Sequence, residues 1–90
     1  MTDGESDWLR LDKFLVFARF CKTRAVATAL VEKGGVRINR QGIDKPHAKL
    51  RPGDVLTLAL PRGVVVVEVL GLPERRGPAS EAQAVYREIA

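Results

Sequence analysis

The stretch "TRAVATALVEKGGVRIN", residues 23–39, contains a change of hydrophobic period that decides the fold class. In its first part, apolar residues recur at the spacing of one helix face, at Val26, Ala27, Leu30 and Val31. After the glycine pair at 34–35 the period falls to two, so that Val36 and Ile38 share one side and Arg37 takes the other. A helix that leads directly into a strand predicts a domain of the α+β class.

Both ends of this helix are marked by residues with capping chemistry. Thr23 precedes the first helical residue, and its hydroxyl group can accept a hydrogen bond from the first turn. The helix should end near Lys33, because Gly34 readily adopts the left-handed conformation that stops a helix. Arg24 then lies in the first turn, where a cation costs about 0.3–1 kcal/mol against the helix dipole. This placement favours an anion site, since free backbone N–H groups at a helix start attract phosphate.

The preceding run, "RLDKFLVFARF" at 10–20, predicts a first helix with Asp12 as its N-cap. Its core face is expected to consist of Leu11, Phe14, Leu15 and Ala18. Phe17 and Phe20 border this face, and we expect them to pack on the core rather than stack on nucleic-acid bases. Because only a short loop separates the two helices, they should pack together as a hairpin.

The rest of the chain has the turn signals and the alternation of a small sheet. A turn at 39–42 should lead into a short strand at Ile43, and "RPGD" at 51–54 has the proline and glycine of a type II turn. Two longer strands follow, at 55–60 and within 64–72. We therefore predict a helix–turn–helix hairpin packed on a small, mostly antiparallel sheet of about four strands, with a short C-terminal helix.

Shifts in composition divide the chain into four parts. Residues 1–8 are polar and acidic, which is typical of a flexible arm, and residues 9–72 form the main domain. A linker rich in proline and glycine spans 73–80, and an S-x-x-Q capping box then predicts a C-terminal helix at 81–90. We expect this last helix to pack back on the domain, with docking of a partner protein as the alternative.

The composition argues against several classes of protein. Ninety residues indicate one small domain, and the longest apolar run, at 64–67, is too short to span a bilayer. The acidic N-terminus lacks the pattern of a secretion signal, so we expect a cytoplasmic protein without membrane contact. A single cysteine excludes an internal disulfide bond, and one cysteine with one histidine is too few for a zinc site.

Nothing in the sequence indicates catalysis. The chain contains none of the motifs of nucleotide-binding, hydrolase or metalloprotease sites. We expect Cys21 to be a small buried apolar residue rather than a nucleophile. His47 lies in a loop-like stretch and should be solvated or make a minor RNA contact. The prediction is a protein that is not an enzyme, with no cofactor and no small-molecule substrate.

Positive charge is confined to one part of the chain. Residues 10–51 contain eleven Lys or Arg and three Asp or Glu, a local net charge of +8. Residues 1–9 carry a net charge of −3, and residues 52–90 carry −1. This asymmetry favours a surface that binds a polyanion over a basic face that only keeps the protein soluble.

Cations flank the starts of both predicted helices, as the pairs Arg10 with Lys13 and Lys22 with Arg24. The planar guanidinium group of arginine, with its fork of donors, suits phosphate. An alternative for Arg24 is an ion pair with Asp12 or Glu32. Further cations could continue the same surface across the first strands: Arg37, Arg40, Lys45 and Lys49.

The order and spacing of these residues resemble a known family. They are similar to the RNA-binding domain named after small-subunit ribosomal protein S-four, also called the alpha-L motif. That family's pattern is R-L-D, then S/T-R-x-x-A-x-x-L-[IV]-x-x-G-x-V-x-[VI]-N, a proline, and G-D before a strand. The residues that carry the resemblance are Arg10, Leu11, Asp12, Thr23, Arg24, Ala27, Leu30, Val31, Gly34, Val36, Ile38, Asn39, Pro46, Gly53 and Asp54.

The tail "RRGPASEAQAVY", residues 75–86, extends the resemblance to one branch of that family, the small ribosome-associated heat-shock proteins and the quality-control factor RqcP. The resemblance implies a non-catalytic protein that binds the large ribosomal subunit while it still holds a peptidyl-tRNA, in rescue or quality control. The implied partners are ribosomal RNA of the large subunit and tRNA. A basic surface of this size suits a monomer.

The residues expected to touch RNA are those in the family's motif and the cations around them: Arg10, Lys13, Arg19, Lys22, Thr23, Arg24, Arg37, Asn39, Lys45 and Lys49. The sequence departs from the pattern at 39–42, where Arg40 adds a cation, and it lacks the long basic extension of some heat-shock members. This favours the shorter quality-control type. Two alternatives stay open: an RNA-binding module of an RNA-modifying enzyme, and a protein-interaction adaptor.

Overall fold

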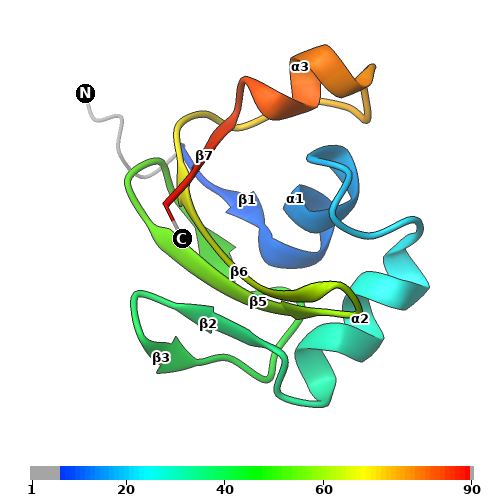
Figure 1. Ribbon diagram of the computed structural model, residues 1–90, viewed down its shortest axis with the longest axis vertical. Coiled ribbons are helices and arrows are strands. Elements are labelled where there is room, and N and C mark those ends of the chain that lie inside the picture. The colour runs from blue at the N-terminus through cyan, green and yellow to red at the C-terminus, as the bar shows by residue number, and fades with distance from the viewer. Residues whose placement is uncertain (1–6, 90) are drawn as a thin grey trace.

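The computed structural model describes residues 7–89 and has the predicted α+β architecture (Figure 1). In chain order its elements are β1 (Leu9–Arg10), α1 (Leu11–Phe17), α2 (Arg24–Glu32), β2 (Val36–Ile38), β3 (Gln41–Gly42), β4 (Lys49–Leu50), β5 (Val55–Leu60), β6 (Gly63–Val69), α3 (Ala79–Gln83) and β7 (Tyr86–Glu88). Helices α1 and α2 lie together on one side of the sheet, and α3 lies at one end of the molecule.

Every strand pair in the described part is antiparallel. The main sheet has five strands in the order β3-β2-β5-β6-β7, and β1 pairs with β4 in a separate two-stranded ladder. The β5–β6 hairpin is the longest pairing, with six residue pairs in register. The prediction of about four strands was slightly low, because β7 and the β1–β4 ladder join segments that are distant in the sequence.

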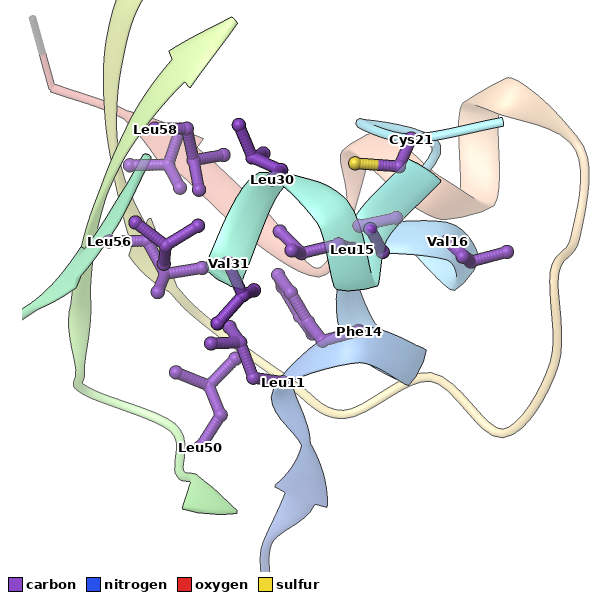
Figure 2. Packing of buried hydrophobic residues seen from close by; sticks show 14 of the residues in the cluster. Leu11, Phe14, Leu15, Val16, Cys21, Leu30, Val31, Leu50, Leu56 and Leu58 are labelled. Atoms are coloured by element: carbon purple, nitrogen blue, oxygen red, sulfur yellow. The ribbon is translucent and has the colours of Figure 1, made fainter. Parts of the chain in front are cut away.

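The core lies between the helices and the sheet, where side chains from α1, α2, β4 and β5 point toward one another (Figure 2). All four residues of the predicted α1 face are buried. On α2, Ala27, Leu30 and Val31 are buried as predicted, but Val26 is 50% exposed, so its place in the core was wrong. At about 100° per residue, Val26 lies roughly a quarter turn from the centre of the face that packs against α1.

The predicted capping of α2 is confirmed at both ends. Thr23 Oγ1 accepts a hydrogen bond of 3.2 Å from the backbone N–H of Val26. Gly34 has φ +87°, the left-handed conformation that ends the helix. The next glycine is needed for space, since a Cβ atom on Gly35 would lie 2.6 Å from a side-chain carbon of Leu30. The glycine pair therefore both stops α2 and lets the chain turn closely into β2.

Asp12 is not the N-cap of α1, contrary to the prediction. Pairing of Leu9 and Arg10 with β4 places Arg10 at the cap position, where its side chain makes no capping bond. The helix thus begins earlier than the capping pattern indicates, and Asp12 lies in its first turn with only 1% of its surface exposed. Its carboxylate is occupied by two arginine side chains instead.

The predicted C-terminal helix at 81–90 is also wrong. Helix α3 begins earlier, within the predicted 73–80 linker, and ends at Gln83; residues Tyr86–Glu88 then form β7. This strand pairs with β6, which satisfies backbone groups along that edge of the sheet. The Tyr86 ring lies 4.6 Å from that of Phe20, between ring centres. The segment therefore packs back on the domain, as expected, but as a strand.

Three local predictions concern the remaining segments. Within the N-terminal arm predicted at 1–8, residues 1–6 lie outside the described residues, and Trp8 lies against Lys49. The short strand expected at Ile43 occurs two residues earlier, as β3. The turn at 51–54 is confirmed by a 3.1 Å hydrogen bond from Asp54 N–H to the Arg51 carbonyl and by φ +95° at Gly53.

Candidate nucleic-acid interface

Three charged side chains from different elements meet at the start of α1, and we call Arg10, Asp12 and Arg24 the Asp12 cluster. Arg10 donates to the Asp12 carboxylate from Nε over 3.2 Å and from Nη2 over 3.0 Å. Arg24 donates to the same carboxylate from Nη2 over 3.2 Å. The ion pair considered as the alternative for Arg24 is therefore present, and it ties the start of α2 to the start of α1.

The electrostatics of the cluster keep Asp12 ionised. Burial raises the pKa of the Asp12 carboxyl, but the hydrogen bonds from Arg10 and Arg24 and their charges outweigh burial, so that the pKa lies below its ordinary value. Two guanidinium groups against one carboxylate leave a net charge of +1. The Asp12 carboxylate also offsets the free-energy cost of placing the cation Arg24 in the first turn of α2.

The cluster keeps donors available for a ligand. The side chains of Arg10 and Arg24 are 39% and 54% exposed, whereas the Asp12 side chain beneath them is 2% exposed. Only two N–H groups of Arg10 and one of Arg24 bond to Asp12, so most of the donors in both planar forks stay free of that carboxylate. A buried carboxylate that orients two exposed guanidinium groups suits the binding of phosphate oxygens.

A third cation, Lys49, lies beside this cluster in the β1–β4 ladder. Arg10 is the register partner of Lys49, and because Leu9 and Leu50 turn inward, both cations turn outward. Lys49 Nζ lies 4.8 Å from the centre of the Trp8 ring. Like charges directly opposite one another destabilise a strand pair, and the Asp12 carboxylate bound to Arg10 offsets part of this cost.

The start of α2 adds the exposed residues Lys22 and Thr23 to this surface. The loop that carries Lys45 lies against the start of α1, because the Pro46 carbonyl accepts a 3.0 Å hydrogen bond from Asp12 N–H. Lys45 itself is exposed, and Lys13 on α1 is half-buried. Seven of the ten predicted site residues thus belong to α1, α2 or the segments in contact with their starts.

The other three predicted site residues lie elsewhere or serve the fold. Arg19 donates a 2.9 Å hydrogen bond to the Gly77 carbonyl and so holds the segment before α3. Asn39 bonds to the Asp54 carboxylate and accepts from Val55 N–H, each over 2.9 Å, which joins β2 to β5. Arg37 is exposed on the sheet face opposite its buried neighbour Val36, away from α1 and α2.

Trp8 is a residue that the sequence reasoning did not single out as a site residue. A sequence signal existed, since it is the chain's only tryptophan and stands two residues before Arg10. Its place beside Lys49 depends on the β1–β4 pairing, which joins segments about forty residues apart. That pairing is not visible in local periodicity.

The candidate metal ligands and the cysteine were also located in the described part of the chain. Among residues 7–89 no group of three or more His, Cys, Asp or Glu side chains is placed to hold a metal ion. Cys21 is buried, and burial raises the pKa of its thiol, which disfavours the reactive thiolate. Across the same residues, none of the helices is both long and apolar enough to cross a membrane.

Comparison with known proteins gives a consistent set of relatives. The family model described as the S4 domain matches residues 9–56. Heat shock protein 15 of Escherichia coli is 43% identical over 82 residues, which cover 91% of this chain and 61% of that protein. The RQC P-site tRNA stabilizing factor of Bacillus subtilis is 36% identical over 82 residues, which cover 89% of this chain and 94% of that protein.

A solved structure agrees with these relatives. The chain matches Vibrio cholerae heat shock protein 15 with a TM-score of 0.85 and 38% identity, over 92% of this chain and 83% of that one. That structure is described as trimeric. The chain therefore spans about three fifths of the E. coli heat shock protein 15 and nearly all of the B. subtilis factor.

Proposed function

Because the chain belongs to the S4 domain family, we propose that it is a non-catalytic RNA-binding protein that acts on the large ribosomal subunit. The observation that carries this proposal is the Asp12 cluster, in which one buried carboxylate orients two exposed guanidinium groups beside the start of α2. Most contacts would be to phosphates and to RNA shape, with little reading of base sequence. This function would place the protein in the cytoplasm.

The names of the relatives support a more specific role. Several are RQC P-site tRNA stabilizing factors, and one of them is covered over 94% of its length. We propose that this protein likewise acts in rescue or quality control, on large subunits that still hold a peptidyl-tRNA. It would contact ribosomal RNA and tRNA together. The alternatives of an RNA-modifying module and of a protein adaptor have no specific observation in their favour.

The proposed contacts follow the described geometry. Arg10 and Arg24 would bind phosphate through their free guanidinium donors, with Lys22 and Lys49 beside them. Thr23, Lys13 and Lys45 border this surface, while Arg19, Arg37 and Asn39 would make outlying contacts. We propose that the protein binds as a monomer, although a similar structure is a trimer. Light scattering at binding concentration measures this state directly.

Co-sedimentation tests the proposed function. The partners are whole ribosomes, free large subunits, and large subunits that hold a trapped peptidyl-tRNA. We expect the strongest binding to the last of these. Equal binding to all three would exclude the rescue role while leaving RNA binding intact, and no binding to any would exclude both.

A matched pair of variants tests the Asp12 cluster in the same assay. The triple variant Arg10→Gln, Asp12→Asn, Arg24→Gln removes the cluster without leaving a buried charge unpaired, and lowers the net charge by one. Arg62→Gln lowers the net charge by the same amount at an exposed position outside the matched residues 9–56. We expect the triple variant to lose most of its binding and Arg62→Gln to keep it. Equal losses would contradict the assignment of the site.

A further inference from the structure

Trp8 is a half-buried aromatic residue that does not belong to the hydrophobic core. The chain has five aromatic residues, all within the described part. Phe14 lies in the core, and Phe17, Phe20 and Tyr86 pack against it. Trp8 is not among the side chains packed against this core, although its neighbour Leu9 is. The large indole ring of Trp8 thus lies outside the core, next to the cation Lys49.

The β1–β4 ladder shows which groups share a face with this ring. Side chains alternate along an extended chain, and Leu9 turns toward the core with its register partner Leu50. Arg10 and its partner Lys49 therefore lie on the other face. Trp8 lies under the Lys49 ammonium at 4.8 Å, so the indole ring belongs to the same face as the two cations.

The cations on this face are held in place from two sides. The Asp12 carboxylate orients Arg10 through two hydrogen bonds, and the indole ring attracts the ammonium group of Lys49. This surface thus holds a half-buried indole ring with the Lys49 ammonium group over it, next to one guanidinium group. Proteins bind single-stranded nucleic acid with this combination, in which a base stacks on the aromatic ring and the backbone follows the cations.

We propose that Trp8 and Lys49 form a stacking subsite for one unpaired nucleotide, adjoining the Asp12 cluster. The base takes the place of the Lys49 ammonium group on the indole ring, and this group turns to the phosphate, which lies between Lys49 and Arg10. A base within a duplex is covered by its neighbours, so the subsite selects a nucleotide in a loop, a bulge or a single-stranded end. This inference rests on the proposed RNA binding and adds a base contact to it.

Two RNA hairpins of identical stem test the subsite, one with an adenosine loop and one with the same loop made abasic. Both keep every phosphate, so they differ only in the bases available for stacking. We expect the intact protein to bind the adenosine loop about 5- to 150-fold more tightly, the usual range for one stacked base. We also expect the fluorescence of Trp8, the only tryptophan, to be quenched by the adenosine loop and not by the abasic loop.

Substitutions separate stacking from charge. Trp8→Leu should bind both hairpins as weakly as the intact protein binds the abasic one, with an unchanged salt dependence. Trp8→Phe keeps a ring and should retain most of the preference. Lys49→Gln should instead reduce the slope of log affinity against log salt by about 0.7–0.9 for both hairpins. The fluorescence measurement needs no variant, so it stands even if Trp8→Leu fails to fold.

The outcomes distinguish the subsite from the proposed function. If the intact protein binds both hairpins equally and neither quenches Trp8, the subsite is wrong and the indole ring only joins β1 to β4. If binding in that case still depends on the Asp12 cluster, the proposed RNA binding stands without it. If the intact protein binds neither hairpin nor large subunits, both proposals fail.

Discussion

At the scale of single residues, Asp12 decides how the candidate interface is arranged. Its carboxylate is buried, accepts donors from Arg10 and Arg24, and so joins a strand end to the start of another helix. An aspartate that stands just before a helical pattern of apolar residues is usually the N-cap, which lies outside the helix. Here the β1–β4 pairing moves the helix start, and the same residue becomes the anchor of two cations.

Asp12→Asn should destabilise the protein at neutral pH by about 1–3 kcal/mol, because it weakens the hydrogen bonds to two charged partners. The folded protein lowers the pKa of Asp12 below its ordinary 3.8. The stability from ionised Asp12 is therefore present above about pH 4 and is lost as the pH falls toward the folded pKa. Urea unfolding at pH 7 and pH 3 should show the difference from the parent protein shrinking at low pH.

Asp44→Asn is the matched control for this experiment, since Asp44 is exposed in the loop before β4. We expect it to change the free energy of unfolding by no more than about 0.5 kcal/mol. A difference for Asp12→Asn that is equally large at both pH values would show that the charge of Asp12 is not what stabilises the fold.

At the scale of elements, α2 is the best-defined unit of the fold. Thr23 caps its start, Gly34 ends it, and a narrow face of Ala27, Leu30 and Val31 packs against α1 and the sheet. These features are local, so the sequence pattern predicted all of them. Only the width of the buried face was overestimated, since Val26 is half exposed.

Thr23→Ala removes the side-chain bond to the N–H of Val26, and we expect a loss of about 0.5–2 kcal/mol in the free energy of unfolding. Thr28→Ala, the same substitution in the middle of α2, is the control and should be close to neutral because alanine favours helix. Chemical denaturation measures both. Equal losses at the two positions would mean that the cap contributes nothing specific.

The orientation of α2 predicts that two apolar residues one helical turn apart differ in how much they contribute to the free energy of unfolding. Leu30→Ala should cost about 2–5 kcal/mol, because it leaves a cavity in the hydrophobic core. Val26→Ala should change stability by about 0.5 kcal/mol or less, since the Val26 side chain is half exposed. Denaturation midpoints decide between them, and a large loss for Val26→Ala would mean that a wider face of α2 is buried.

At the scale of the whole molecule, the basic half of the chain and its folded surface agree only in part. Arg10 of β1 and Arg24 at the start of α2 meet at Asp12, and Lys49 of β4 is the register partner of Arg10. Arg37 lies on another sheet face, and Arg19 is bonded to the segment before α3. Net charge therefore predicts the class of ligand, and the fold selects which cations form one surface.

About four to seven phosphate contacts should make binding to large subunits steeply dependent on salt. The slope of log affinity against log salt is then expected between about −3 and −6 from 50 to 200 mM salt. The triple variant of the Asp12 cluster should have a clearly shallower slope, whereas Arg62→Gln should keep the parent's. A nearly flat dependence for the parent protein would contradict phosphate binding as the source of affinity.

Much of this fold could be predicted because its signals lie close together in the sequence. The helical stripes, the Thr23 cap, the turn at Gly53 and the β5–β6 hairpin all depend on residues within a few positions of one another. The candidate cations Arg10 and Arg24 were also predicted, since they stand at helix starts. The prediction of a C-terminal helix failed, because pairing of this segment with the open edge of β6 outweighed its helical spacing.

By itself, the sequence determined the α+β class, the boundaries of α2 and the concentration of positive charge between residues 10 and 51. Only the tertiary structure decided that Asp12 is buried beneath two arginines, that Trp8 lies against Lys49, and that Tyr86–Glu88 forms a strand. The physical reason is the separation along the sequence over which each interaction acts. Periodicity and capping act between neighbours along the chain, whereas ion pairs and strand pairing join residues that only folding brings together.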